Sequence, residues 1–327
     1  MATLYLARRH GAAGFSRLVA LKMIHPNLVA QPGLIEMFVD EARICSQISH
    51  PNVVHVEEFG VLDGAHYLVM EYVDGCSLTE LLQVYDRQHR KLDPELAAGL
   101  VAQVAGGLHA AHETRDQDGQ PLEIIHRDIS QSNILLSAAG GAKLIDFGIA
   151  KARNRMSETQ TPSLKGKYKY VAPEQATGAP VDRRCDVFSL GVVFWELLVG
   201  KPLFTEDSAV ALFRRLHRTD ALPPSTLNSE VPTVLDWIVL AMLQHDPARR
   251  LQTAAEVQRR IMQAVPGAAN RVAAELGPLA IDVRDQRAAW QAARRAAGEP
   301  IESSNHVSFS PTPRSQRTSV GQPDDRA

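Results

Sequence analysis

Cysteine is scarce in this chain of 327 residues, in which only Cys45, Cys76 and Cys185 occur. An odd count without pairable or metal-binding spacing argues against a disulfide framework and against a zinc site. Reduced thiols of this kind are typical of the cytoplasm. We therefore expect neither disulfides nor zinc.

An excess of charge is also missing, since the formal net charge is -2. No broad positive field is available to gather nucleic acid or anionic lipid. The longest apolar run, VFSLGVVFWELLVG at 187–200, contains Glu196 and is shorter than the ~20 residues of a membrane helix. It predicts a buried core helix. Because the first residues, MATLYLARRHGAAG, lack the apolar region of a secretory signal, we expect a cytoplasmic protein with no membrane span and no nucleic-acid partner.

Short strands and one helix are predicted for the first part of the chain. Residues 3–8 and 17–24 read as strands around a glycine-containing turn. Apolar residues at helical spacing in GLIEMFVDEARICSQIS, residues 33–49, predict a helix. The segment 52–73 predicts two strands joined at an Asp-Gly turn.

The chain then becomes mainly helical, at 77–85, 94–113 and over 186–264, with short strands at 133–137 and 142–147 between them. Apolar periodicity fades after Pro266, and 299–327 is rich in Ser, Pro and Arg, which is typical of disorder. The segment 285–297 is expected to be a solvated linker helix rather than a docking element. The expected parts are 1–73, 74–266 and a largely disordered tail, 267–327.

Several short motifs follow one another in a specific order. They are VALK ending at Lys22, a helix with Glu41, HRDISQSN with Asp128 and Asn133, Asp146-Phe147-Gly148, APE at 172–174 and DVFSLG at 186–191. Each alone has an ordinary alternative, such as a solvent-facing lysine or a strand that ends in a turn. Their order and spacing are those of the protein-kinase signature set.

The combination resembles eukaryotic-type (Hanks-type) protein kinases, most closely the bacterial serine/threonine branch, over roughly residues 1–265. The resemblance implies an α+β, two-lobed fold, with a small antiparallel-sheet N-lobe that lacks the first strand and carries one key helix, and a larger, mostly helical C-lobe. It also implies transfer of the ATP γ-phosphate to Ser or Thr of protein substrates in bacterial signalling. ATP and Mg²⁺ or Mn²⁺ would be the cofactors, and self-association for autophosphorylation is an option.

Two other functions remain open at this stage. One is a pseudokinase that acts as a binding or scaffold module. The other is a small-molecule phosphotransferase, against which the APE and DVFSLG segments argue because in the family they build a platform for protein substrates.

The resemblance gives each catalytic residue a physical task, since phosphoryl transfer requires mainly positioning and charge neutralisation. Lys22 would hold the α and β phosphates, with Glu41 ion-paired to it. Asp146 and Asn133 would bind the metal ions, and Asp128 would accept or orient the proton of the substrate hydroxyl. The residues expected around adenine are Leu4, Ala20, Met70, Glu71, Val73 and Leu135.

A supporting set is also implied by the resemblance. Cys45, Val56, His126 and Phe147 would stack into a column that links the lobes. Asp186 would cap the backbone of the catalytic loop, and Glu174 would form a buried ion pair with Arg250. For Cys45 the ordinary alternative is a buried apolar cysteine, and for Ala20, Glu71, Val73 and Leu135 it is ordinary packing.

The glycine-rich phosphate loop of the family is missing, because the alignment places Met1 at its tip. One explanation is a real truncation, which leaves a sheet edge open. The other is a start codon assigned to an internal methionine, which we favour because an exposed hydrophobic edge is a liability.

Two further positions depart from the pattern. Ser130 stands where serine/threonine kinases usually keep a lysine, and Lys167 stands where a threonine usually follows a glycine. Lys167 either takes over the missing charge or is a solvated loop lysine. Arg127 is expected to receive an activation-loop phosphate, for which the candidates are Ser157, Thr159, Thr161 and Ser163.

Overall fold

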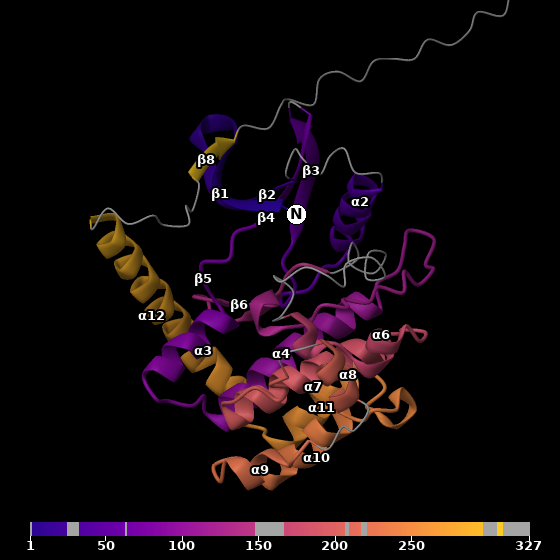
Figure 1. The fold of residues 1–327 in the computed structure, drawn as a ribbon. Helices are drawn as coiled ribbons and strands as arrows, with labels where there is room; N and C mark the ends of the chain where they lie inside the picture. The colour runs from indigo at the N-terminus through magenta and orange to yellow at the C-terminus, as the bar shows by residue number, and fades with distance from the viewer. Residues whose placement is uncertain are drawn as a thin grey trace, which may run out of the picture.

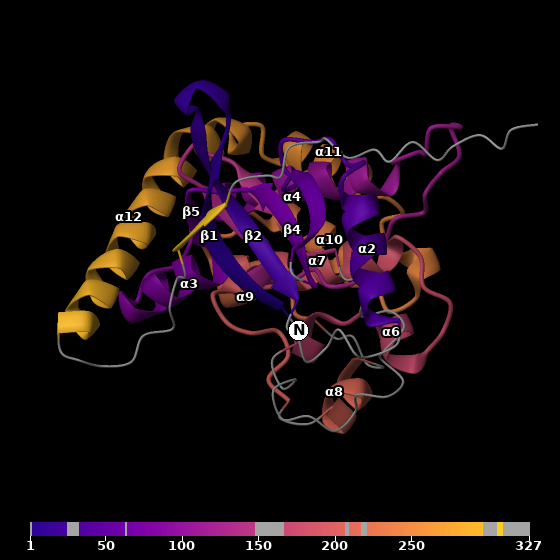
Figure 2. The same ribbon diagram turned by 90° about the horizontal axis from the view of Figure 1, so that it is seen from above.

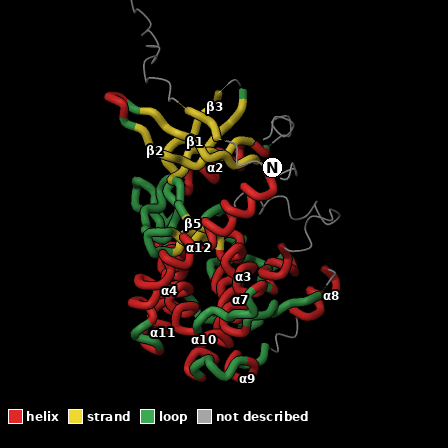
Figure 3. The backbone as a smooth tube through the Cα atoms, turned by 90° about the vertical axis from the view of Figure 1, so that its left-hand side faces the viewer, coloured by secondary structure: helices red, strands yellow, loops and turns green. Residues whose placement is uncertain are grey.

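The computed structural model describes residues 2–24, 33–62, 64–147, 167–206, 209–216, 221–296 and 306–309. A twisted sheet with one helix lies over a larger helical body (Figure 1). Figure 3 shows the same division, with the strands of the sheet at one end and the helices at the other. This is the α+β, two-lobed architecture that the sequence predicts.

The N-lobe sheet contains the four predicted strands in two hairpins. They are β1 (Ala2–His10), β2 (Ser16–Ile24), β3 (Val56–Leu62) and β4 (Ala65–Glu71), with the short helix η1 (Ala12–Gly14) in the first turn. The sheet order is β3-β4-β2-β1-β8, and these four strands pair antiparallel. Helix α2 (Leu34–Cys45) packs on this sheet through Phe38 and Ala42.

Two parts of the prediction for the sheet edge differ from the structure. The strand β8 (His306–Phe309) pairs parallel with β1, with Leu6 opposite His306. A strand therefore lies at the edge where the first strand was expected to be absent, and part of the segment expected to be disordered is ordered. The physical reason is that an edge strand offers a row of N–H and C=O groups that any extended segment can pair with.

The C-lobe begins with β5 (Gly75–Ser77), which follows the hinge. The next elements are α3 (Leu78–Arg87), α4 (Pro94–His112), η2 (Gln131–Asn133), β6 (Ile134–Ser137) and β7 (Ala142–Leu144). After the undescribed residues 148–166 come η4 (Lys167–Tyr170), α6 (Pro173–Thr177), α7 (Arg184–Val199), α8 (Ala209–Leu216), α9 (Pro224–Leu227), α10 (Thr233–Met242), η5 (Pro247–Arg249) and α11 (Ala254–Ala264).

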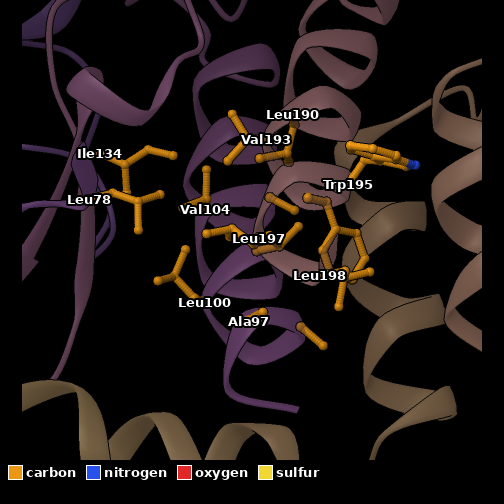
Figure 4. Packing of buried hydrophobic residues seen from close by; sticks show 14 of the residues in the cluster. Leu78, Ala97, Leu100, Val104, Ile134, Leu190, Val193, Trp195, Leu197 and Leu198 are labelled. Atoms are coloured by element: carbon orange, nitrogen blue, oxygen red, sulfur yellow. The ribbon is translucent and has the colours of Figure 1, made fainter. Parts of the chain in front are cut away.

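Local chemistry explains where the main helices start. Asp93 accepts hydrogen bonds from the second and third backbone N–H groups of α4, and Pro94 follows at the first helical position. Helices α4 and α7 form the centre of the core, and their side chains Leu100, Val104, Val193 and Leu197 belong to one buried cluster (Figure 4). Among the described residues, no helix is long and apolar enough to cross a membrane.

Helix α12 (Ala268–Ala296) corrects the predicted domain division. It runs along one side of the C-lobe (Figures 1 and 2) and packs against α3, α4, β5 and β6. Its side chains Val272, Leu276, Ala280 and Val283 are at most 3% exposed and belong to the main core. The prediction of a largely disordered tail is therefore wrong for 268–296. The helix predicted for 285–297 is present over 285–296, and its residues 285–292 are mostly exposed.

Close backbone packing brings α12 onto the lobe. A Cβ atom at Gly277 would lie 2.7 Å from the carbonyl oxygen of Ala138, and one at Gly99 would lie 2.5 Å from that of Ala268. Glycine at both positions lets the helix approach α4 and the turn after β6.

Candidate catalytic and nucleotide site

The buried carboxylate of Asp186 holds the catalytic loop. It lies in the first turn of α7, where Oδ2 accepts from the His126 N–H at 2.8 Å and Oδ1 from the Arg127 N–H at 2.7 Å. His112 Nε2 lies 2.9 Å from Oδ2. Burial alone would raise the pKa of Asp186, but the contacts with His112, His126 and the Arg127 N–H lower it below the ordinary value. The group is therefore a carboxylate that fixes the loop backbone.

Arg127 has a left-handed backbone, with φ of 63°. A conformation of this kind costs of order 1 kcal/mol or more for a non-glycine residue, and persists only where surrounding contacts compensate it. The hydrogen bond to Asp186 supplies one such contact. Gln175 Nε2, which donates to the Arg127 carbonyl at 3.3 Å, supplies another.

Asn133 lies next to Asp128 and fixes its orientation. Its Nδ2 donates to the Asp128 carbonyl at 2.7 Å and to Asp128 Oδ2 at 2.9 Å. These bonds use only the amide nitrogen. Asn133 is 8% exposed and stands at the end of η2, directly before β6.

A contact between the lobes joins Lys22 to Asp146. Lys22 Nζ, on β2, donates to Asp146 Oδ1 at 2.8 Å, and the Asp146 side chain is 45% exposed. Asp146 has φ of 54° and stands two residues after β7. Glu41 lies on α2, but its side chain is outside the described residues, so the expected pair with Lys22 stays a prediction.

The residues present are suited to magnesium. The Asp146 carboxylate and the Asn133 amide oxygen are the hard oxygen donors that this ion prefers. The Ile145 N–H donates to the Asn133 carbonyl at 3.0 Å, which ties the two metal-binding candidates together. Within the described ranges no cluster of three or more His, Cys, Asp or Glu is placed to hold a metal ion.

The column proposed to link the lobes is a packed unit. Cys45, Val56 and Phe147 lie in one cluster, and the His126 ring is 4.5 Å from that of Phe147. Burial lowers the pKa of His126, despite the opposing effect of Asp186. A neutral ring fits its contacts, since Nε2 lies 3.0 Å from the Ile145 carbonyl and Nδ1 accepts from the Asp128 N–H at 3.3 Å.

The residues expected around adenine come from both lobes. Ala20 on β2 pairs with Met70 on β4, and Leu135 on β6 pairs with Ser77 on β5. Leu4 lies opposite Lys22 and is 58% exposed. The strand β4 ends at Glu71, and Val73 lies between it and β5.

The Glu71 N–H already donates to the His55 carbonyl at 3.0 Å. The Glu71 side chain accepts from Lys143 Nζ at 2.7 Å.

Glu174 and Arg250 form a two-pronged ion pair, with N–O distances of 2.8 and 3.1 Å. Both side chains are buried, and Arg250 also donates to the carbonyls of Gln244 and His245. Breaking a buried pair by removing one partner typically costs about 3–5 kcal/mol, because the other charge is left uncompensated. The pair fixes the APE segment, next to Gln175.

The structure adds a hydrogen-bond network of three side chains, Gln131, Tyr170 and Glu196, to which the sequence analysis assigns no role. Glu196 on α7 accepts at Oε2 from Gln131 Nε2 at 2.7 Å and from the Tyr170 hydroxyl at 2.9 Å, and at Oε1 from the Leu203 N–H at 3.1 Å. Burial raises the pKa of Glu196, against the effect of these donors. The sequence signal for this network is Glu196 itself, a lone acidic residue inside an apolar run.

The positions of the expected regulatory residues are only partly described. Ser130 Oγ lies 3.0 Å from Ser132 Oγ. Lys167 begins η4, but its side chain is outside the described residues, as are Ser157, Thr159, Thr161 and Ser163. Two expectations therefore stay predictions. One is that Lys167 replaces the charge missing at Ser130, and the other is that Arg127 receives an activation-loop phosphate.

The geometry agrees with comparisons to known proteins. The family model described as the protein kinase domain matches residues 6–262. The chain belongs to the protein kinase family. Protein kinases use ATP with Mg²⁺ or Mn²⁺, and the closeness to bacterial serine/threonine kinases places the chain in the Hanks-type bacterial branch.

Two curated relatives share the kinase region. Tyrosine-protein kinase MasK of Myxococcus xanthus is 40% identical over 254 residues, which cover 78% of this chain and 39% of the relative. Serine/threonine-protein kinase PknB of Mycobacterium leprae is 36% identical over 256 residues, covering 77% and 39%. This kinase chain thus spans about two fifths of the length of these relatives.

A solved structure supports the same fold. The PknI kinase domain of Mycobacterium tuberculosis matches with a TM-score of 0.58 and 26% identity, over 81% of this chain and 91% of that one. The kinase architecture is therefore supported by structure as well as by sequence.

Proposed function

We propose that this kinase transfers the γ-phosphate of ATP to serine or threonine hydroxyls of proteins in bacterial signalling. One observation carries the proposal: the Asn133 amide orients Asp128, while Lys22 and Asp146 meet across the lobes. The arrangement places a proton acceptor beside residues that can bind phosphate and metal. All four are the groups that phosphoryl transfer requires.

Each side chain has a separate task in this proposal. Asp128 orients the substrate hydroxyl and takes its proton as the new O–P bond forms and the bond to the β-phosphate breaks. Lys22 binds the α and β phosphates, and Asp146 and Asn133 hold Mg²⁺. When bound, Mg²⁺ neutralises the charge that develops on the phosphate oxygens.

A second acceptor class is tyrosine. Ser130 replaces the usual lysine of serine/threonine kinases, and the relative from Myxococcus xanthus is named a tyrosine kinase. Losing a charge-assisted contact to the γ-phosphate costs about 1.5–3 kcal/mol, or roughly 10- to 100-fold in rate. Transfer to serine or threonine would be slower and still possible. The alternative of a scaffold pseudokinase gains no support from relatives that are all named as kinases.

Location and assembly are further proposals. The three cysteines, each within the described residues, are buried and form no disulfide, which is compatible with a reducing cytoplasm. Protein substrates would include a second copy of the chain, if autophosphorylation proceeds by self-association.

The test measures steady-state phosphorylation of a generic protein substrate by wild type and Asp128→Asn. We expect kcat to fall about 100-fold or more, since a positioned base contributes 10²–10⁴-fold. Asp118→Asn, on an exposed turn that follows α4, is the matched control and should retain wild-type kcat. Equal rates for wild type and Asp128→Asn would overturn the proposal, and product carrying only phosphotyrosine would replace serine and threonine by the second acceptor class.

A further inference from the structure

The second half of α12 lies against the segment that leaves the hinge between the lobes. Arg284 Nη1 donates to Asp74 Oδ2 at 2.7 Å. Arg287 Nη1 donates to Glu80 Oε1 at 2.9 Å, and its Nη2 to the Gly75 carbonyl at 3.3 Å. One turn of α12 thus binds three positions within seven residues of chain.

Each of these positions is connected to its surroundings. Tyr72 in the hinge lies near the Asp74 carboxylate, and burial together with the charge of this carboxylate raises the pKa of Tyr72. Glu80 Oε2 accepts from the Ser77 N–H at 2.7 Å, and Ser77 Oγ accepts from the Glu80 N–H at 3.2 Å. This reciprocal capping box starts α3 directly after β5.

Little freedom is left at Gly75. A Cβ atom there would lie 1.9 Å from the Leu136 carbonyl, so the chain passes directly against β6. The neighbouring β5 residue Ser77 pairs with Leu135, one of the residues expected to contact adenine. A displacement of the 74–77 backbone would therefore displace the floor of the nucleotide site.

The two arginines are held in place by the core. Val283, on the turn that carries Arg284 and Arg287, is 3% exposed, and Ala280 is fully buried. A helix anchored in this way presents its charges with little loss of backbone entropy, so the ion pairs restrain the partner segment rather than the helix. Burial alone would raise the pKa of Glu80, but the bonds from Ser77 and Arg287 lower it, as expected for a carboxylate held in its charged form.

We propose that α12 is a working part of the nucleotide site, in which Arg284 and Arg287 are positioning residues that hold the segment after the hinge, and with it the hinge backbone, in the geometry that binds adenine. This proposal rests on the proposed function only for the identity of the nucleotide. The arginines touch neither Asp128 nor Asp146. Their loss should therefore weaken nucleotide binding and leave the rate of the chemical step nearly unchanged.

The experiment compares the full chain with Arg284→Ala/Arg287→Ala and with Arg271→Ala. Arg271, at the other end of the same helix, pairs with Asp93 at 3.2 Å and Glu275 at 2.9 Å, far along the chain from the hinge segment. Arg271→Ala therefore serves as a control that also removes ion pairs from α12, but away from the hinge segment. The dissociation constant for a non-hydrolysable ATP analogue with Mg²⁺ is measured by calorimetry, together with KM and kcat.

For the double variant we expect the dissociation constant and KM to rise roughly threefold to tenfold, the range that the loss of partly exposed ion pairs produces. The kcat should change by less than about twofold, because the groups of the chemical step stay in place. Arg271→Ala should leave both constants unchanged. Arg284→Lys, which keeps the charge opposite Asp74, should recover part of the affinity.

Amide exchange over residues 72–80 without nucleotide gives an independent readout, and should be faster only in the double variant. Unchanged affinity and exchange, or equal effects in Arg271→Ala, would overturn the proposal. Faster exchange without a change in affinity would also overturn it, because the arginines would then be merely structural. If the wild type binds the analogue but phosphorylates nothing, the proposed function fails while an affinity loss in the double variant still supports the role of α12.

Discussion

At the scale of single residues, the site combines strained backbones with strong local contacts. Arg127 and Asp146 both have positive φ, at 63° and 54°. Arg127 lies in the catalytic loop, and Asp146 is one of the metal-binding candidates. The hydrogen bond from the Arg127 N–H to Asp186 compensates the backbone strain at Arg127, and Lys22 donates a hydrogen bond to Asp146. Strain of this kind persists where the surroundings fix the geometry, as they do when a site is formed before its ligand binds.

The first prediction concerns Glu196. Burial raises its pKa in the folded protein. The folded state therefore binds a proton that the unfolded state has already lost, and this stabilising contribution, complete below the ordinary pKa of about 4.3, disappears as pH rises through the raised folded value. The Tm of wild type relative to Glu196→Gln should thus increase when pH is lowered from neutral toward 5, as measured by thermal denaturation.

The control for this prediction is Glu230→Gln, whose side chain lies on the surface. It reports the background pH dependence of a lost surface carboxyl group. A Tm difference between wild type and Glu196→Gln that stays constant with pH would contradict the prediction.

The sequence could predict some of these residues and not others. Asp128, Asn133, Asp146 and Lys22 stand in motifs whose spacing is fixed by the chemistry, so their grouping was predictable. The network of Glu196 was not, because it joins residues 131, 170 and 196, whose distances along the chain carry no pattern. Only the packing of α7 against the catalytic loop brings them together.

At the scale of elements, periodicity predicted the four N-lobe strands and the core helices, because their apolar residues alternate or recur with the period of the structure. It failed for α12. The buried positions Val272, Leu276, Ala280 and Val283 do follow helical spacing, but small alanines surround them and reduce the contrast between the two faces. Its residues Arg284 and Arg287 pair with Asp74 and Glu80, which are far away in the sequence.

The second prediction tests whether α12 belongs to the core. Leu276 is fully buried, whereas Ile281 on the same helix is 38% exposed. Leu276→Ala should lower the free energy of unfolding by about 2–5 kcal/mol, through lost burial and the cavity left behind. Ile281→Ala, with a loss of similar size in side chain, should cost far less. Urea denaturation of both variants decides, and equal small losses would mean that α12 contributes no core.

At the scale of the whole molecule, several contacts among the described residues join the two lobes. Cys45 and Val56 from the N-lobe share a cluster with Ile124 and Phe147 from the C-lobe. The ion pair between Lys22 and Asp146 also crosses between the lobes, and α12 holds the segment next to the hinge. A ligand that binds between Lys22 and Asp146 must therefore change the stability of the whole fold.

The last prediction uses this coupling. At a free concentration of about 100 times its dissociation constant, an ATP analogue with Mg²⁺ should stabilise the folded wild type by about 2.7 kcal/mol, which raises Tm by a few degrees or more in a chain of this size. Part of the increase should require Mg²⁺. Asp146→Asn should abolish the part that depends on Mg²⁺, because a neutral amide replaces the carboxylate that would hold the ion.

The substitution is a fair one for two reasons. Asparagine tolerates the left-handed backbone that Asp146 adopts, at φ of 54°. The lost ion pair with Lys22 is partly exposed, so by itself it should cost only about 0–1 kcal/mol. The ligand-free variant should therefore melt close to wild type, and thermal scans with analogue, with and without Mg²⁺, isolate the metal. An Asp146→Asn protein that keeps the full Mg²⁺-dependent rise in Tm would show that the ion is held by other groups.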